Sequence, residues 1–195
     1  MYRPALAFSN SIVIDAKALR RFVPRKHQSK VSYIPYQAPK QKSLVPLNRM
    51  VYEKSFALCV CRLEPENNIE TIVDGYNASQ TPHPLIIFGA LNDFGKKLQK
   101  KYANDKRIRF VGANYNQEDL NNLRFFSRYY FHGHSVGGTN PSLLEAMASN
   151  TLIIAHNNIF NKSILEENAH YFDSSKGITT VLNQDILFEH KETFA

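Results

Sequence analysis

The residues with the clearest chemical potential stand at positions 134–145, where an apolar run gives way to glycines and then to a helix-forming segment. Gly137 and Gly138 let the backbone turn tightly and approach a ligand closely. Asn140 is a favourable N-cap residue, and Pro141 suits the first position of a helix. The sequence therefore predicts a helix N-terminus that faces a ligand, and the positive end of the helix dipole favours an anion such as a phosphate.

Hydrogen-bond donors and one carboxylate surround this predicted helix N-terminus. The hydroxyls of Thr139 and Ser142, and the backbone N–H groups of Ser142 and Leu143, are suited to donate to the anion. Glu145 lies about one turn further along, where its carboxylate would accept two hydrogen bonds from a sugar diol such as a ribose. An ordinary strand-to-helix turn with a surface glutamate would explain Asn140, but it leaves Glu145 and the paired glycines without a role.

The elements that must position these residues are apolar runs alternating with amphipathic segments. Strands are predicted at 56–63, 84–89, 107–112, 129–135, 151–156 and 170–173. Helices are predicted at 67–79, 94–104, 118–128, 141–149 and 163–169. This alternation predicts a Rossmann-like α/β domain, with a doubly wound parallel sheet and right-handed crossovers. Ligands bind such sheets beyond the carboxyl ends of the strands, which is where residues 134–145 begin.

The first 48 residues differ from the rest in pattern and charge. They are predicted to form a strand at 11–16, a helix at 17–23 and a strand at 31–36, followed by a hinge at 37–48. Residues 1–55 hold 11 Lys or Arg against 2 Asp or Glu, so the net charge of +7 arises here. The basic stretch 17–30 is either a solvated edge or a patch for an anionic membrane surface. It has no RNA-recognition or helix-turn-helix pattern, so no nucleic-acid partner is expected.

Composition excludes several classes of protein. A chain of 195 residues with 43% hydrophobic and 21% charged residues is neither disordered nor a disulfide mini-protein. Cys59 and Cys61 are the only cysteines, which disfavours a disulfide framework and favours a reducing compartment. No apolar run approaches the roughly 18 residues of a membrane span. His132 and His134 share a strand face, but no third ligand stands at a recognisable spacing, so no metal is expected.

Two motifs resemble those of a known family. GHSVGGTNPSLLEAMAS at 133–149, together with FALCVCRLEPENNIETIVDGY at 56–76, resembles the C-terminal domain of retaining GT-B glycosyltransferases of family four. Within that family the sequence is most similar to bacterial rhamnosyltransferase-like enzymes of capsule and exopolysaccharide assembly. The resemblance implies transfer of a rhamnose-like sugar from a UDP- or dTDP-linked donor to a glycan or polyprenyl-linked acceptor, without a metal or other cofactor. It also implies a cytoplasmic enzyme, which the stretch 17–30 would hold at the inner face of the plasma membrane.

The resemblance assigns roles to the residues at matching positions. Glu145 matches the second glutamate of the family's E-x7-E motif, which binds the ribose, whereas Gly137 stands in place of the first. Arg62 matches the arginine that holds the diphosphate and stabilises the leaving group, whereas Asn67 stands in place of the family's lysine. The loss of these two motif residues weakens the expected contacts to the donor sugar and to the diphosphate.

The resemblance also suggests how the remaining positions compensate. Gly112 and Ala113 match the backbone that holds the base. Without the lysine, Arg62, the helix N-terminus at 140–143 and His134 would neutralise the phosphates.

Two domains are implied by the resemblance. Residues 49–195 are expected to form the donor-binding domain, and residues 1–48 the hinge and the last strand–helix–strand of an acceptor-side domain. The end at 186–195 is expected to be truncated relative to the family. Because the acceptor site and the other catalytic residues would precede Met1, we expect this chain alone to bind nucleotide weakly and to transfer no sugar.

Two other functions remain open. A nucleotide-binding module, or an inactive remnant, would keep the site without the transferase chemistry. A nicotinamide-dependent enzyme would need a G-x-G-x-x-G turn after its first strand, where CRLEPENN at 61–68 stands instead.

Overall fold

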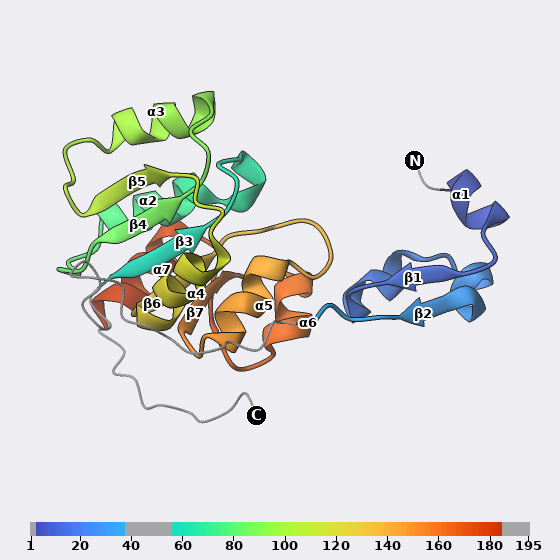
Figure 1. Ribbon diagram of the computed structural model, residues 1–195. Coiled ribbons are helices and arrows are strands. Elements are labelled where there is room, and N and C mark those ends of the chain that lie inside the picture. Colours follow the sequence, from blue (N-terminus) through green and yellow to red (C-terminus); the bar gives the residue numbers. More distant parts are fainter. Residues whose placement is uncertain (1–2, 38–55, 185–195) are drawn as a thin grey trace.

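A computed structural model describes residues 3–37 and 56–184 of the chain (Figure 1). The described residues form a large α/β domain and a small N-terminal unit beside it (Figure 1). Most of the predicted hinge at 37–48, the predicted domain boundary after residue 48 and the terminal segment 186–195 lie outside the described residues. None of the described helices has the length and apolar character needed to cross a membrane.

Six parallel strands form the sheet of the α/β domain, in the spatial order β5–β4–β3–β6–β7–β8. These strands are β3 (Ala57–Val60), β4 (Leu85–Phe88), β5 (Ile108–Gly112), β6 (Tyr129–His132), β7 (Leu152–His156) and β8 (His170–Phe172). The chain builds the sheet outward from β3 to β5, returns to the centre at β6, and builds outward again on the other side. All six predicted strands and the doubly wound parallel topology are thereby confirmed.

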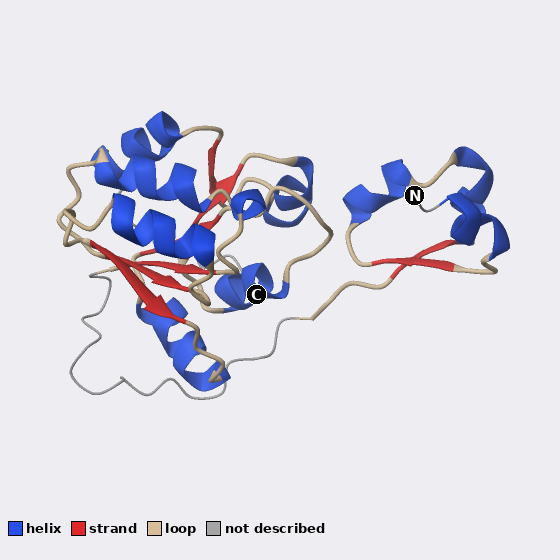
Figure 2. Cartoon of the chain, turned by 90° about the horizontal axis from the view of Figure 1, so that it is seen from above, coloured by secondary structure: helices blue, strands red, loops and turns tan. Residues whose placement is uncertain are grey.

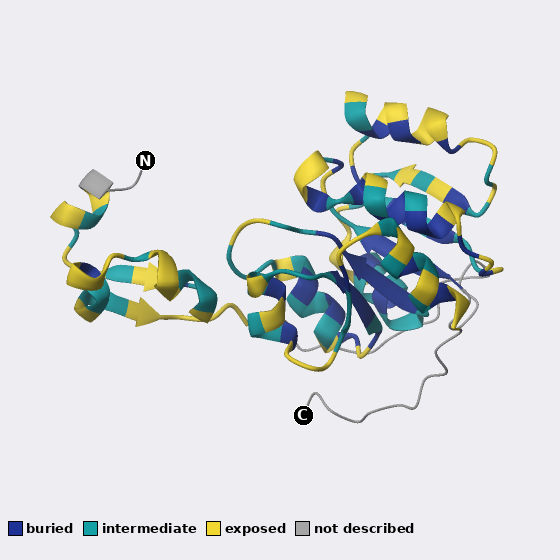
Figure 3. Ribbon diagram, turned by 180° about the vertical axis from the view of Figure 1, so that it is seen from behind, coloured by how far each residue is buried: buried dark blue, intermediate teal, exposed yellow. Residues whose placement is uncertain are grey.

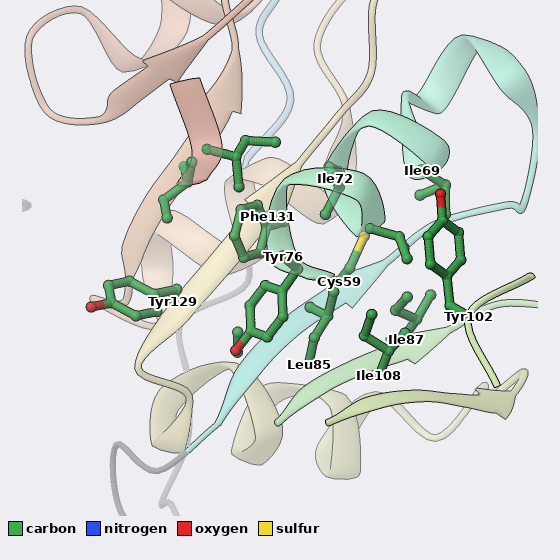
Figure 4. Packing of buried hydrophobic residues seen from close by; sticks show 14 of the residues in the cluster. Cys59, Ile69, Ile72, Tyr76, Leu85, Ile87, Tyr102, Ile108, Tyr129 and Phe131 are labelled. Atoms are coloured by element: carbon green, nitrogen blue, oxygen red, sulfur yellow. The ribbon is translucent and has the colours of Figure 1, made fainter. Parts of the chain in front are cut away.

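Helices cover both faces of this sheet (Figure 2). On one face lie α2 (Ile69–Asn77), α3 (Asp93–Lys101) and α7 (Ser175–Asn183), and on the other lie α4 (Gln117–Phe126), α5 (Pro141–Ala148) and α6 (Ile159–Leu165). Strand β3 contributes side chains to a hydrophobic core on each face of the sheet, because successive side chains on a strand point to opposite faces. Cys59 packs with Ile72 and Tyr76 of α2 (Figure 4), whereas Leu58 packs with Leu143 of α5.

The outer side of α3 is exposed to solvent (Figure 3). It presents four lysines that are all exposed: Lys96, Lys97, Lys100 and Lys101. The opposite side of the helix buries Leu98 in the core, so the basic residues form the solvated face that the amphipathic pattern predicts.

Three helical segments of the α/β domain differ from the predictions. The predicted helix at 67–79 is divided into a 3-10 turn, η3 (Pro65–Asn67), and α2, because Asn68 between them adopts a left-handed φ of 51°. The predicted helix at 163–169 starts earlier, at Ile159, because the Asn158 side chain caps it by accepting from Phe160 N and Asn161 N. Helix α7 was not predicted, since its threonines and Gly177 have low helix propensity.

The N-terminal unit holds a helix, α1 (Arg3–Phe8), and two short parallel strands, β1 (Ile12–Ile14) and β2 (Val31–Tyr33). The predicted helix at 17–23 is a 3-10 helix, η1 (Lys17–Phe22), and a second one, η2 (Arg25–Lys30), follows Pro24. Proline has no N–H and restricts the residue before it, so a continuous α-helix through this stretch is disfavoured.

Three contacts join this unit to the α/β domain. Thr139 Oγ1 donates to the Asp15 carbonyl at 2.7 Å, and the rings of Phe22 and Phe160 stack with centroids 5.9 Å apart. The Asp15 carboxylate also occupies the space that a Cβ at Gly138 would need. Glycine at position 138 is therefore favoured by this tertiary contact, whereas Gly137 is the glycine of the pair that has a positive φ, of 108°.

Helices α2 and α7 approach each other closely at Gly75. A Cβ there would lie 2.6 Å from the Ser175 carbonyl oxygen and 2.7 Å from Ile178 Cβ. We expect Gly75→Ala to lower the free energy of unfolding by about 1–3 kcal/mol, because the two helices must separate. Urea unfolding followed by circular dichroism measures the change.

The matched control is Gly177→Ala in α7, where a Cβ would lie 3.8 Å from Phe172 Cβ, an ordinary van der Waals contact. This substitution is expected to be neutral or to stabilise by up to about 1 kcal/mol, because alanine favours a helix over glycine. Equal destabilisation by the two substitutions would contradict the close packing at Gly75.

Candidate functional site

A cavity of about 420 Å³ opens at the carboxyl ends of the central strands, where the direction of winding reverses. Loops after β3, β4, β5 and β6 contribute to its wall, together with α4 and the N-terminal turns of α5. The lining residues are Val60, Cys61, Arg62, Phe88, Gly89, Ala90, Ala113, Asn114, Tyr115, Leu120, Arg124, His134, Asn140, Pro141, Ser142 and Glu145.

The structure brings six of the predicted site residues together in this wall: Arg62, Ala113, His134, Asn140, Ser142 and Glu145. Three more, Gly137, Gly138 and Thr139, line a neighbouring cavity of about 110 Å³. The remaining three, Asn67, Gly112 and Leu143, line neither of these two cavities. Leu143 is instead fully buried in the core beneath α5.

Two loops at the mouth of the cavity are tied together by hydrogen bonds. Ser135 donates to the Glu66 carbonyl from its backbone N at 3.0 Å and from its hydroxyl at 2.7 Å. Asn68 Nδ2 donates to the Gly133 carbonyl at 2.7 Å. A Cβ at Gly133 would overlap the Asn67 carbonyl, so only glycine permits this approach. The end of β6 is thereby fixed against the turn that follows β3.

Arg62 and Asn67 have different roles in this turn. Asn67 is buried, and its Nδ2 donates to the Arg62 carbonyl at 2.8 Å, so it shapes the turn from below. Arg62 is exposed at the cavity wall and forms no ion pair with another described residue. Its guanidinium is therefore available for an anionic ligand.

Helix α5 begins as the sequence predicts, with Asn140 as its cap and Pro141 at its first position. The cap itself uses the two predicted N–H groups: Ser142 N donates to Asn140 Oδ1 at 2.9 Å, and Leu143 N donates to the Asn140 carbonyl at 3.0 Å. The Ser142 hydroxyl contacts Tyr130 Oη. A phosphate at this helix end would therefore interact with the positive end of the helix dipole. Its hydrogen bonds to Ser142 N and Leu143 N would compete with those that these two groups already donate to Asn140.

Glu145 is paired with an arginine that the sequence analysis missed. Arg124 Nη2 lies 2.6 Å from Glu145 Oε2, and the exposed fractions of the two side chains are 1% and 17%. No motif marked Arg124, because an arginine inside the amphipathic helix α4 looks like a residue of its solvated face. Only the packing of α4 against α5 brings it to the carboxylate.

The smaller cavity holds a pair of stacked histidines. The rings of His132 and His134 have centroids 4.6 Å apart and lie nearly parallel. Burial lowers the pKa of His134 to about 4, with a further contribution from the nearby Arg62 charge, and burial lowers the pKa of His132 well below its ordinary value. Both rings are neutral at pH 7. The expectation that His134 supplies positive charge to a phosphate is therefore not supported, although its ring can still form hydrogen bonds.

Within the described ranges 3–37 and 56–184, no three His, Cys, Asp or Glu side chains gather in a way that would hold a metal ion. Cys59 and Cys61 are free thiols with their sulfur atoms 3.8 Å apart.

The fold and the cavity define a doubly wound, Rossmann-like α/β domain, with a crevice at the reversal of its strand order. Residues 48–184 match the family model described as "Glycosyl transferases group 1". Because the match spans more than half of the sequence, the chain belongs to this family. No curated protein matches the sequence significantly.

Solved structures of similar fold include Anabaena HepE, crystallised in complex with UDP and glucose, with a TM-score of 0.80 at 15% identity. That similarity covers 94% of this chain and 55% of HepE. The lipopolysaccharide outer core galactosyltransferase WaaB in its apo form has a TM-score of 0.70 at 14% identity, covering 94% of this chain and 56% of WaaB. The pneumococcal O-GlcNAc transferase GtfA, in complex with UDP and GlcNAc, has a TM-score of 0.66 at 15% identity. That similarity covers 94% of this chain and 39% of GtfA. The chain thus spans little more than half the length of HepE.

The buried histidines predict a pH dependence of stability. The unfolded chain takes up protons on His134 below the ordinary pKa of 6.5, whereas the folded ring resists protonation until about pH 4. The free energy of unfolding should therefore fall as the pH is lowered from about 6.5 to about 4, and His134→Gln should make this fall shallower. Urea unfolding at a series of pH values measures how the free energy of unfolding changes in each variant.

The control is Asn114→Gln in the wall of the larger cavity, which removes no titratable group and should keep the wild-type slope. If His134→Gln also kept that slope, His134 would not be the buried neutral group described above.

Proposed function

We propose that this chain forms the nucleotide-sugar donor site of a glycosyltransferase, with the donor in the cavity of about 420 Å³. The observation that carries the proposal is the convergence of Arg62, the α5 N-terminus and Glu145 on one cavity at the strand-order reversal. Arg62 and the α5 N-terminus suit a diphosphate, and Glu145 suits a ribose. Membership of the glycosyl transferases group 1 family supports the same reading, as do the UDP and UDP-glucose complexes of HepE.

The chemistry that these residues support is stabilisation of a leaving diphosphate. The acceptor hydroxyl attacks the anomeric carbon on the face from which the phosphate leaves, the bond from that carbon to the phosphate oxygen breaks, and the departing phosphate oxygen takes up the hydroxyl proton. Negative charge then develops on the diphosphate. Arg62 and the positive end of the α5 dipole are placed to oppose that charge. No described side chain of this cavity has to act as a nucleophile in this scheme.

The finer assignments extend this proposal. The donor sugar is rhamnose-like and is transferred with retention. Gly137, which offers no carboxylate to a sugar hydroxyl, is compatible with a 6-deoxy sugar that has one hydroxyl fewer to hold. The base is uracil or thymine, held beside Gly112 and Ala113, and neither a metal nor another cofactor takes part. The acceptor is a glycan or polyprenyl-linked chain of capsule or exopolysaccharide assembly.

The basic stretch 17–30 belongs to the same proposal as a contact with anionic lipid at the cytoplasmic face of the membrane. Its charged side chains Lys17, Arg20, Arg21, Arg25 and Lys26 are exposed on η1 and η2. Phe22 lies among them with 61% of its surface exposed, and an aromatic ring within a basic patch suits a lipid interface.

Calorimetric titration of the chain with UDP, dTDP and NAD tests the donor site. We expect saturable binding of one pyrimidine diphosphate and none of NAD. Arg62→Ala should weaken that binding by about 10- to 100-fold, because a charge-assisted hydrogen bond contributes about 1.5–3 kcal/mol. The exposed Arg109 of β5 lies outside the cavity, so Arg109→Ala should leave the affinity unchanged.

Binding of NAD alone would point to a nicotinamide-dependent protein. Failure of a folded chain to bind any of the three nucleotides would contradict the donor site. Because the chain alone is expected to transfer no sugar, only binding without transfer when an acceptor, a donor and an acceptor-side domain are all supplied would favour a nucleotide-binding module.

A further inference from the structure

Arg124 is the most deeply buried charged side chain near the cavity, with 1% of its side chain exposed. A buried guanidinium is costly unless it is neutralised and its N–H groups find acceptors. Glu145 Oε2 at 2.6 Å provides the opposite charge. Since Arg124 also lines the cavity wall, its position concerns the ligand site as well as the core.

Other groups hold the guanidinium in place. Nη1 donates to Asn121 Oδ1 at 3.2 Å within α4, and Nη2 donates to Ser142 Oγ at 3.2 Å on α5. The guanidinium carbon lies 6.0 Å from the centre of the Tyr130 ring, on β6. Arg124 is thus held within its own helix, by α5 and by the sheet, whereas its Nε is buried without a hydrogen-bond partner among the described residues.

The carboxylate of Glu145 is held at only one of its oxygens. Oε2 is engaged by Arg124, while Oε1 accepts no hydrogen bond from any residue that the structure describes. Glu145 lines the cavity, and its side chain is 17% exposed, so the unengaged oxygen is accessible from that side. One oxygen is anchored and the other is left for a ligand hydroxyl.

We propose that Arg124 is the positioning residue for Glu145: it anchors Oε2 so that Oε1 accepts the 3′-hydroxyl of a nucleoside diphosphate. The inference rests on the proposed donor site. A glutamate has three rotatable bonds, and fixing it before the ligand arrives removes an entropic cost of binding. The ion pair therefore sets how strongly the site distinguishes a nucleotide that carries this hydroxyl from one that lacks it.

The experiment compares the tighter binder of UDP and dTDP with its 3′-deoxy analogue, by calorimetry on the full chain. Wild type should prefer the hydroxylated nucleotide by about 10- to 100-fold, as expected for a hydrogen bond to a charged acceptor. Arg124→Met and Glu145→Gln should each reduce this ratio to near 1. Arg124→Lys, which keeps the charge but lacks the planar fork, should give an intermediate ratio.

Two controls separate positioning from general damage. Arg109→Met makes the same substitution at the exposed Arg109, outside the cavity, and should keep the wild-type ratio. Thermal unfolding of the two single variants and of Arg124→Met/Glu145→Gln forms a double-mutant cycle without nucleotide. The double variant should lose less in melting temperature than the sum of the two single losses, because neither charge is then left buried alone.

The outcomes distinguish this inference from the donor site on which it rests. If a folded Arg124→Met or Arg124→Lys chain keeps the full wild-type ratio while Glu145→Gln loses it, the positioning role is overturned and the donor site stands. Additive losses in the cycle would also overturn it. If wild type binds neither UDP nor dTDP, both proposals fail together.

Discussion

The parallel pairing of β3 with β6 at the centre of the sheet is the constraint on which the site depends. The helix that follows β3 packs on one face and the helix that follows β6 packs on the other. The two connections therefore leave the sheet edge in opposite directions, and a crevice opens between them. Hydrogen bonds from Ser135 and Asn68 then join the loop after β6 to the turn after β3.

Burial determines the electrostatics of the crevice more than residue type does. The two histidines are neutral because charging them would require hydration that the site does not offer. Arg124 keeps its charge, yet Glu145 neutralises it. The positive character that remains comes from the exposed Arg62 and the dipole of α5. An anion is thus attracted to one side of the cavity, where Arg62 and the helix end meet.

The sequence predicted the elements of the α/β domain well, because each buried strand is a continuous apolar run and each long helix has a strong amphipathic period. It was less successful where local signals are weak. Helix α7 contains β-branched residues and Gly177, which have low helix propensity, and it packs against α2 at Gly75. The 3-10 geometry of η1 and the break at Asn68 depend on backbone conformations that side-chain periodicity does not encode.

The sequence by itself determined the site's components: the glycine turn, the Asn140 cap, Arg62 and Glu145 were all recognisable from residue type and spacing. Only the tertiary structure decided how they are used. It paired Glu145 with Arg124, used the N–H groups of Ser142 and Leu143 in the cap, and made His134 neutral. The physical reason is that charge, protonation and hydrogen-bond availability depend on the neighbours and water around a group, and distant segments supply those neighbours only after folding.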